Sequence, residues 1–160
     1  LVFALLGTTR ARARADGMAA QQAYARVDYG LTKWLIDGAA SCSPRPRFVY
    51  LSALGVSQAS KNAYIAARAR AEAALRASGV PWTIARPAVI TGADRDDERP
   101  LERVAGVVGD GVLALVGVLG GTSLRERYSS MDATTLARGL VRVGLDPAFA
   151  DRVAGAEDLR

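Results

Sequence analysis

The sequence contains no histidine and a single cysteine, Cys42. Zinc sites built from cysteine and histidine, Ser-His-Asp triads and Cys-His nucleophile pairs all need residues that this chain does not have. One cysteine cannot form a disulfide within the chain, so secretion is not indicated and a reducing cytoplasm is the expected compartment. We therefore expect neither a metal site nor a histidine-dependent hydrolase.

Long hydrophobic runs are also scarce. Residues 101–119 are apolar and glycine-rich, but Glu102, Arg103 and Asp110 interrupt them and leave 112–119 as the longest uncharged stretch. A membrane span needs about 20 apolar residues. The opening run LVFALL is too short for a secretory signal and has no basic residues before it. The sequence thus predicts no membrane association.

Lysine is nearly absent: of 21 basic residues only Lys33 and Lys61 are lysines, and the formal net charge is +5. The arginines are spread along the chain, except that Arg10, Arg12 and Arg14 alternate in a predicted loop. These three could grip a phosphate of a dinucleotide or of nucleic acid. No aromatic residue lies among them to stack on bases, so we favour a solvated loop and expect no nucleic-acid partner.

Short apolar runs alternate with helical patterns along the chain. The apolar runs predict strands over 1–6, 48–52, 82–86 and, less regularly, 128–131. Helices are predicted over 17–24, over 28–40, over 60–78 with Ser60 as cap and Gly79 as stop, and over 132–143 with Asp132 as cap. Strands and helices that alternate at this spacing pair in parallel through right-handed crossovers, which predicts an open α/β sheet.

In such a sheet, ligands bind beyond the carboxyl ends of the strands. The residues at these ends are Gly7 with Thr8 and Thr9, Ser52 with Ala53, and Pro87 with Ala88. The polar segment 94–100 that follows the last of them predicts a surface loop, and 101–119 a helix or helical hairpin that covers a cleft.

Ser52, Tyr64 and Arg68 form the most informative constellation. Tyr64 and Arg68 are four residues apart and share one face of the predicted helix. A tyrosine hydroxyl titrates at about 10 in water, but an adjacent cation favours the phenolate, and a serine hydroxyl can hold a substrate carbonyl. The pattern predicts a proton relay for hydride transfer to or from a nicotinamide. Tyr64 packing on the sheet, with Arg68 paired to Glu72, explains the same spacing structurally.

Several segments together resemble a known family. FVYLSALG, AYIAARARAEAAL and SGVPWTIARPAVITG look like the second half of extended or atypical short-chain dehydrogenases/reductases. The start, ALLGTTRARARADG followed by YARVDY, is similar to the narrower group of Tat-interacting-protein-like oxidoreductases. The matching positions are Leu6 to Arg10, Val27-Asp28, Ser52, Tyr64, Arg68 in place of a lysine, Glu72, Arg86-Pro87 and Gly92.

The resemblance implies a doubly wound, Rossmann-like domain that binds NADP or NAD. It places Gly7, Thr8 and Thr9 against the cofactor, and Pro87, Ala88 and Val89 at the border of the nicotinamide. By the same resemblance, Ser52 would orient a substrate carbonyl, Tyr64 would be the acid/base and Arg68 would take the place of the lysine. Residues 94–128 would form the lid that selects the substrate.

Two departures from the family pattern modify this interpretation. The planar fork of Arg68 does not replace a compact ammonium that also reaches ribose hydroxyls. The glycine-rich phosphate turn, which follows the first strand in this fold, does not occur in residues 1–160. We therefore interpret 1–160 as a single partial domain, the C-terminal part of a carbonyl/alcohol oxidoreductase. The alternative is a non-catalytic NAD(P)-sensing regulatory or protein-interaction module.

Overall fold

The fold is an α/β arrangement around four parallel strands, in a computed structural model that describes residues 1–87, 90–91 and 131–160. The sheet order is β1-β2-β3-β6, formed by Val2–Ala4, Phe48–Leu51, Trp82–Ala85 and Arg152–Ala154. In the register, Ala4 lies beside Tyr50, and Tyr50 beside Ile84. Two further strands, β4 (Ile90–Thr91) and β5 (Met131–Asp132), form a second parallel pair. The predicted parallel α/β sheet is confirmed.

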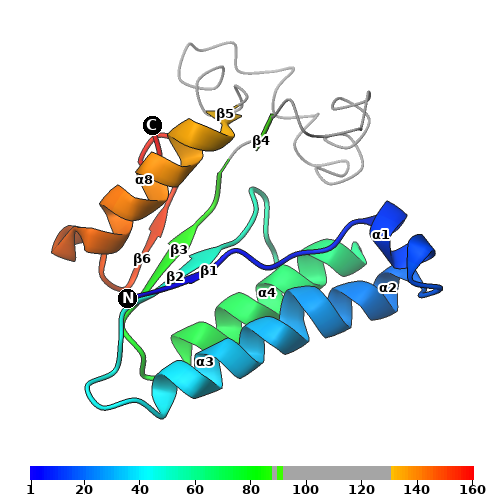
Figure 1. Cartoon of the computed structure of the whole chain (residues 1–160), viewed down its shortest axis with the longest axis horizontal. Helices are drawn as coiled ribbons and strands as arrows, with labels where there is room; N and C mark the ends of the chain where they lie inside the picture. Colours follow the sequence, from blue (N-terminus) through cyan, green and yellow to red (C-terminus); the bar gives the residue numbers. More distant parts are fainter. Residues whose placement is uncertain (88–89, 92–130) are drawn as a thin grey trace.

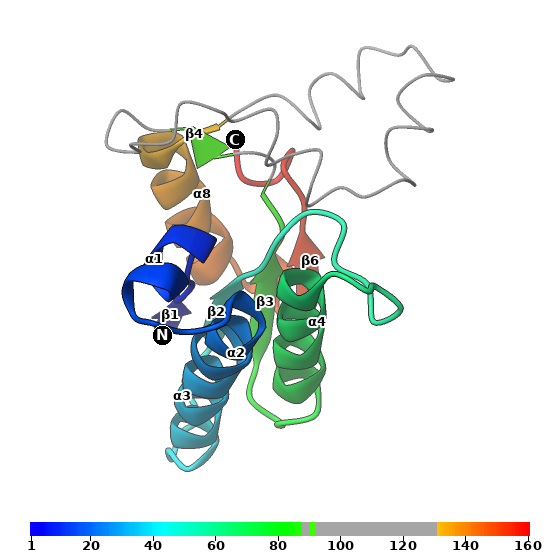
Figure 2. The same ribbon diagram turned by 90° about the vertical axis from the view of Figure 1, so that its right-hand side faces the viewer.

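Helices cover both faces of the sheet (Figure 1). They are α1 (Arg10–Ala15), α2 (Ala20–Ala23), the π-helical segment η1 (Tyr24–Leu31), α3 (Thr32–Ala40), α4 (Ala63–Arg76), α8 (Ala133–Leu145) and the 3₁₀ turn η2 (Pro147–Phe149). The segment from α2 to α3 and helix α4 lie side by side on one face (Figure 2), while α8 lies on the other. The described part of the chain therefore has three layers: helices, sheet and helix.

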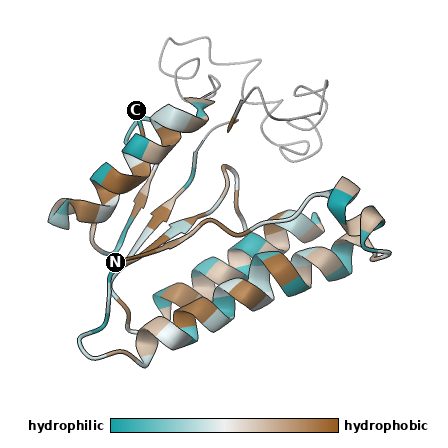
Figure 3. Ribbon diagram, in the orientation of Figure 1, coloured by the Kyte–Doolittle hydropathy of each residue, from teal (hydrophilic) through white to brown (hydrophobic). Residues whose placement is uncertain are grey.

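Each face of the sheet has its own apolar core. Phe48, Tyr50 and Ile84 point toward α3 and α4, where they pack with Ile36 and Leu75. Alternate strand residues point to the opposite face, and there the core consists of Val49, Ala85, Ala154, Met131, Leu136, Leu140, Val143 and Leu159. In Figure 3 the hydrophobic colour follows the central strands and forms stripes on α3 and α8.

The helix boundaries in the N-terminal 40 residues differ from the sequence expectation. The arginine-rich segment is helical, because the Thr9 side chain accepts from the Arg12 amide at 3.1 Å and so caps α1. The two helices predicted over 17–24 and 28–40 are one helical run from Ala20 to Ala40, whose middle turns are wider. Arg10, Arg12 and Arg14 therefore do not lie in a loop.

Two helix starts show how capping sets the boundaries. Asn62, and not Ser60, caps α4, since its side chain accepts from the amides of Tyr64 at 3.0 Å and Ile65 at 3.4 Å. Asp132 caps α8 as predicted, accepting from Thr134 and Thr135 at 2.9 Å.

The predicted loop at 94–100, the apolar segment 101–119 and the lid at 94–128 lie outside the described residues. Of the strand predicted over 128–131, residues 128–130 also lie outside the described residues, and Met131 begins strand β5. In the part of the chain that the structure describes, no helix is long and apolar enough to cross a membrane.

Candidate active site

Helix α4 carries three polar side chains four residues apart, Tyr64, Arg68 and Glu72. This spacing places them on one face of the helix. Arg68 and Glu72 are buried against the sheet, and Tyr64 is half-buried near the start of the helix. Arg68 and Glu72 contact residues at the carboxyl ends of the strands, where a parallel sheet binds its ligands, whereas the Tyr64 ring packs on Tyr24 of η1 and on Arg68.

The guanidinium of Arg68 is enclosed by protein groups. Its Nη1 donates to the carbonyl of Leu51 at 2.6 Å and to the hydroxyl of Tyr50 at 3.3 Å, and its Nη2 lies 3.0 Å from Asp28 Oδ1. Within the described residues, the buried Nε has no hydrogen-bond partner. The Arg68 Cζ lies 5.2 Å from the ring centroid of Tyr64, in cation–π range. Arg68 and Tyr64 are therefore neighbours, as their spacing in the sequence predicts.

Asp28, on η1, is the counter-ion of Arg68 and is completely buried. Its second oxygen, Oδ2, accepts from the backbone amide of Thr8 at 3.2 Å. Burial raises the pKa of Asp28 above its usual value, and Arg68 and the Thr8 amide oppose this. The Asp28 carboxylate therefore joins the end of β1 to helix α4.

Electrostatics around Arg68 favour its charged form. Burial works against the charge, but the interactions with Tyr64, Tyr50 and Asp28 outweigh it and raise the pKa of Arg68. Burial also raises the pKa of Tyr50 to about 12, so Tyr50 is a neutral hydrogen-bonding partner at physiological pH.

Gly7 leaves room for this ion pair. A Cβ at Gly7 would lie 2.6 Å from Arg68 Nη2 and 3.4 Å from Asp28 Oδ1. The sequence interpretation assigned the small side chain to cofactor approach, and the structure adds that it leaves room for the guanidinium. Thr8 is half-buried, and Gly7 and Thr9 are exposed at the carboxyl end of β1.

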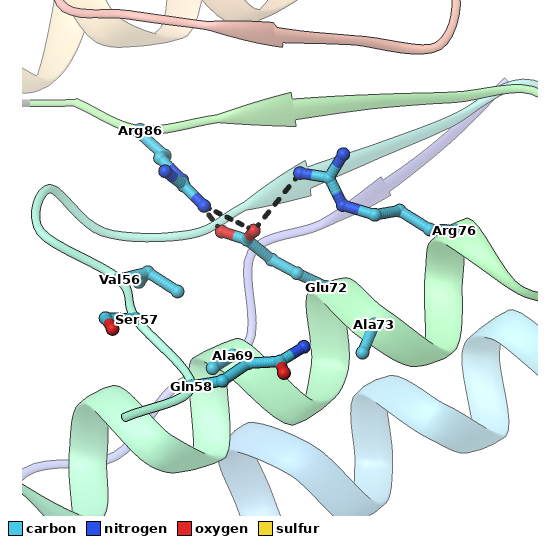
Figure 4. Close-up of a pocket in the computed structure, with 8 residues that line it drawn as sticks. All are labelled: Val56, Ser57, Gln58, Ala69, Glu72, Ala73, Arg76 and Arg86. Carbon is cyan, nitrogen blue, oxygen red and sulfur yellow. Dashed lines mark hydrogen bonds and ion pairs between the residues drawn. The ribbon is translucent and has the colours of Figure 1, made fainter. Parts of the chain in front are cut away.

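Ser52 belongs to a second cluster, centred on Glu72. The Ser52 hydroxyl donates to Glu72 Oε1 at 2.6 Å, and Arg86 binds the same carboxylate through Nε at 2.9 Å and Nη2 at 2.6 Å. Arg76 reaches Glu72 Oε2 at 3.4 Å (Figure 4). Because the Ser52 hydroxyl already donates its hydrogen to Glu72, Ser52 Oγ offers another group only its lone pairs in this arrangement.

A pocket of about 170 Å³ adjoins this second cluster. Its lining consists of Glu72, Arg76 and Arg86 together with Val56, Ser57, Gln58, Ala69 and Ala73 (Figure 4). Both arginines are already bound to Glu72, so its carboxylate partly neutralises their positive charge in the pocket.

The structure thus divides the predicted site residues between two clusters. Gly7, Thr8 and Arg68 meet around Asp28, and Tyr64 lies against Arg68, whereas Ser52 is bound to Glu72. The alternative pairing of Arg68 with Glu72 is wrong, since each has a partner distant in the sequence. Pro87 is buried just after β3, and Ala88 and Val89 lie outside the described residues.

Sequence reasoning missed the roles of Asp28 and Tyr50. Asp28 stood in the Val-Asp pair that carried the resemblance, and an acidic residue between apolar helix positions signals a buried partner. No group of three or more His, Cys, Asp or Glu side chains that could hold a metal occurs among residues 1–87, 90–91 and 131–160.

Parallel strands, helices on both faces and polar residues at the strand ends define a Rossmann-like, NAD(P)-binding domain. The chain belongs to the NAD(P)H-binding family, whose model matches residues 1–112. NAD(P) is accordingly the cofactor that the family implies.

Among solved structures, the chain is similar to a Bacillus halodurans protein described as an NAD-dependent epimerase/dehydratase, with a TM-score of 0.57 and 13% identity. The match covers 88% of this chain but only 63% of that protein, and at this identity it shows the fold alone. No curated protein matches the chain at a significant level.

The described residues at the ends of β1 and β3 could hold part of an NAD(P) molecule. The sequence interpretation places the cofactor against Gly7, Thr8 and Thr9 and its nicotinamide beside Pro87. In the structure, Gly7 and Thr9 are exposed at the end of β1, Thr8 is half-buried, and Pro87 is buried just after β3. Thr9 uses its hydroxyl to cap α1, so it would contribute backbone only.

Proposed function

We propose that the protein is an NAD(P)-dependent oxidoreductase that interconverts a carbonyl compound and an alcohol. The main support is the Arg68 guanidinium 5.2 Å from the ring centroid of Tyr64, on the helix that leads away from the end of β2. A permanent cation beside a phenol is the arrangement that a tyrosine proton relay needs.

In this proposal each residue has a separate task. The bound cofactor would supply or accept the hydride. Tyr64 would give its phenolic proton to the carbonyl oxygen during reduction and take it back during oxidation, and Arg68 would stabilise the negative charge on the tyrosine oxygen.

Ser52 would contact the same substrate oxygen. While the Ser52 hydroxyl donates to Glu72, Ser52 Oγ can accept a hydrogen bond from an alcohol hydroxyl. Donation to a carbonyl requires the Ser52 hydroxyl to turn away from Glu72. The geometry therefore favours binding of the alcohol form.

The experiment measures NADPH and NADH oxidation by the complete gene product over a panel of aldehydes and ketones, and the reverse reaction with alcohols. Tyr64→Phe should lower kcat by about 100-fold or more while calorimetry shows unchanged nucleotide binding. Tyr29→Phe is the matched control, since the Tyr29 ring packs on Arg70 instead. Equal rates in Tyr64→Phe and the wild type would refute the role of Tyr64.

A non-catalytic NAD(P)-binding module is the second candidate. Two observations favour it: the Arg68 guanidinium is occupied by Asp28, Leu51 and Tyr50, and the Ser52 hydroxyl is occupied by Glu72. Nucleotide binding without turnover on any substrate, and without rescue by Arg68→Lys, would support this module over the enzyme.

A further inference from the structure

We propose that the Asp28–Arg68 ion pair is a positioning device for the β1–α1 turn, residues 7–9, and that nucleotide affinity depends on this pair although neither side chain binds the nucleotide. The proposal deepens the proposed function and rests on its placement of the cofactor at this turn.

The ion pair supports the turn at two consecutive residues. Asp28 Oδ2 accepts the Thr8 amide at 3.2 Å, while Oδ1 lies 3.0 Å from Arg68 Nη2. The same Nη2 would lie 2.6 Å from a Cβ at Gly7. The backbone of the turn is thus bonded at Thr8 to a carboxylate 20 residues away in the sequence, and the Arg68 guanidinium fills the space that a side chain at Gly7 would need.

Buried contacts hold the Arg68 side chain in this position. Its side chain is 7% exposed and that of Asp28 0%. Nη1 is occupied by the Leu51 carbonyl and the Tyr50 hydroxyl at the end of β2. A compact ammonium could leave such a site to reach a ligand, but a planar fork held on three sides is fixed. Arg68 is therefore a positioning residue for the turn, and the nucleotide would meet Gly7 and Thr8.

Buried ion pairs respond differently to removal of one partner and to replacement of both, and this difference separates the positioning role from a general effect on stability. Removal of one partner leaves an uncompensated charge and destabilises the fold, whereas replacement of both by apolar groups of similar size is often neutral. An apolar pair still lacks the acceptor for the Thr8 amide. The double replacement should therefore preserve folding and release the turn.

The experiment compares Asp28→Leu/Arg68→Met with the wild type by three measurements: thermal unfolding, hydrogen exchange of the Thr8 amide by NMR without nucleotide, and NADPH affinity by calorimetry. Loss of the Thr8 hydrogen bond should raise its exchange rate by about tenfold. We expect NADPH affinity to fall by a similar factor while the double variant still unfolds in one cooperative transition, at a lower Tm because Leu51 O and Tyr50 Oη lose the Arg68 donor. Arg70→Met, at an exposed arginine of the same helix that packs on the Tyr29 ring, is the control and should leave Thr8 exchange and NADPH affinity unchanged.

A second variant keeps the test valid if the double replacement does not fold. Gly7→Ala places a methyl group against Arg68 Nη2 and should displace the turn, raising both Thr8 exchange and the NADPH Kd. Gly38→Ala is its control, since a Cβ there meets nothing within 4 Å.

Unchanged Thr8 exchange or unchanged NADPH affinity in the folded double variant would overturn the proposal, and the same outcome in Gly7→Ala would do so if the double variant is unfolded. A wild-type protein that binds neither NADPH nor NADH would overturn it as well, together with the cofactor part of the proposed function. Normal binding and a normal response of the variants, without turnover, would refute the oxidoreductase alone.

Discussion

The Glu72 carboxylate is shared by two arginines that should contribute unequally to stability. Arg86 makes two bonds to it, at 2.9 and 2.6 Å, and its side chain is 29% exposed. Arg76 makes a single contact at 3.4 Å, and its side chain is 43% exposed. We predict that Arg86→Met is clearly more destabilising than Arg76→Met.

The magnitudes follow from this geometry. Breaking a buried ion pair by removing one partner costs about 3–5 kcal/mol, which we reduce to about 2–3 kcal/mol because water reaches part of Arg86. An exposed ion pair such as Arg76–Glu72 contributes about 0–1 kcal/mol. Arg76 also stacks on Trp82, with its Cζ 4.5 Å from the ring centroid, but a methionine keeps much of that contact. Arg76→Met should therefore cost about 1 kcal/mol or less.

Urea unfolding of both variants, combined with Glu72→Gln in double-mutant cycles, measures the two couplings directly. We expect a coupling of about 2 kcal/mol between Glu72 and Arg86, and below about 0.5 kcal/mol between Glu72 and Arg76. High salt should reduce the Arg76 effect more, because it is the more exposed pair. Equal costs for the two arginine variants, or equal couplings to Glu72, would refute the reasoning.

Three further predictions concern stability elsewhere in the fold. Gly139→Ala should lower the unfolding free energy by about 1–2 kcal/mol in urea titrations, because its Cβ would lie 2.8 Å from the backbone carbonyl carbon of Leu159, and this overpacking exceeds the gain in helix propensity. Asp132→Ala should lower Tm at pH 7, and the difference in Tm from the wild type should shrink below pH 3.8. Hydrogen bonds from the side chain and amide of Thr135 lower the pKa of Asp132, so the stabilisation by Asp132 is lost as pH falls through its folded-state pKa. Burial raises the pKa of Tyr50 from 10.0 to about 12, so above pH 10 the unfolded state loses this proton first. In chemical denaturation the wild type should lose about 2 kcal/mol more stability than Tyr50→Phe between pH 10 and pH 12.

The sheet could be predicted from the sequence because its strands are short apolar runs bounded by glycine and proline. The strand β6 was missed, since three residues, Arg152–Ala154, show no period, and only their pairing with β3 identifies them. The helix α1 was missed because alternating arginines have no apolar face, and a local bond from Arg12 to Thr9 decides its conformation. Local patterns thus predicted the larger elements, and the remainder depends on single contacts.

The sequence was enough to choose the residues of the candidate site, but not the partners that each of them binds. Spacing on α4 placed Tyr64 beside Arg68, and the structure has them in contact. The same spacing favoured a bond from Arg68 to Glu72, yet both side chains bind residues distant in the sequence. A helical pair four residues apart gains a few tenths of a kcal/mol, whereas a buried charge needs a full set of partners. Burial therefore decided the pairing, and the sequence alone does not reveal it.

Helix α4 connects the carboxyl ends of three strands through these partners. Arg68 contacts the end of β2 at Leu51 and, through Asp28, the turn after β1. Glu72 binds Ser52 after β2 and Arg86 after β3. A polar face on a helix that packs against a sheet costs apolar burial, so its benefit lies in fixing the positions of the strand ends. Because the same contacts stabilise the fold and shape the site, a loss of activity in any variant of this face identifies a functional role only when its unfolding free energy is measured alongside.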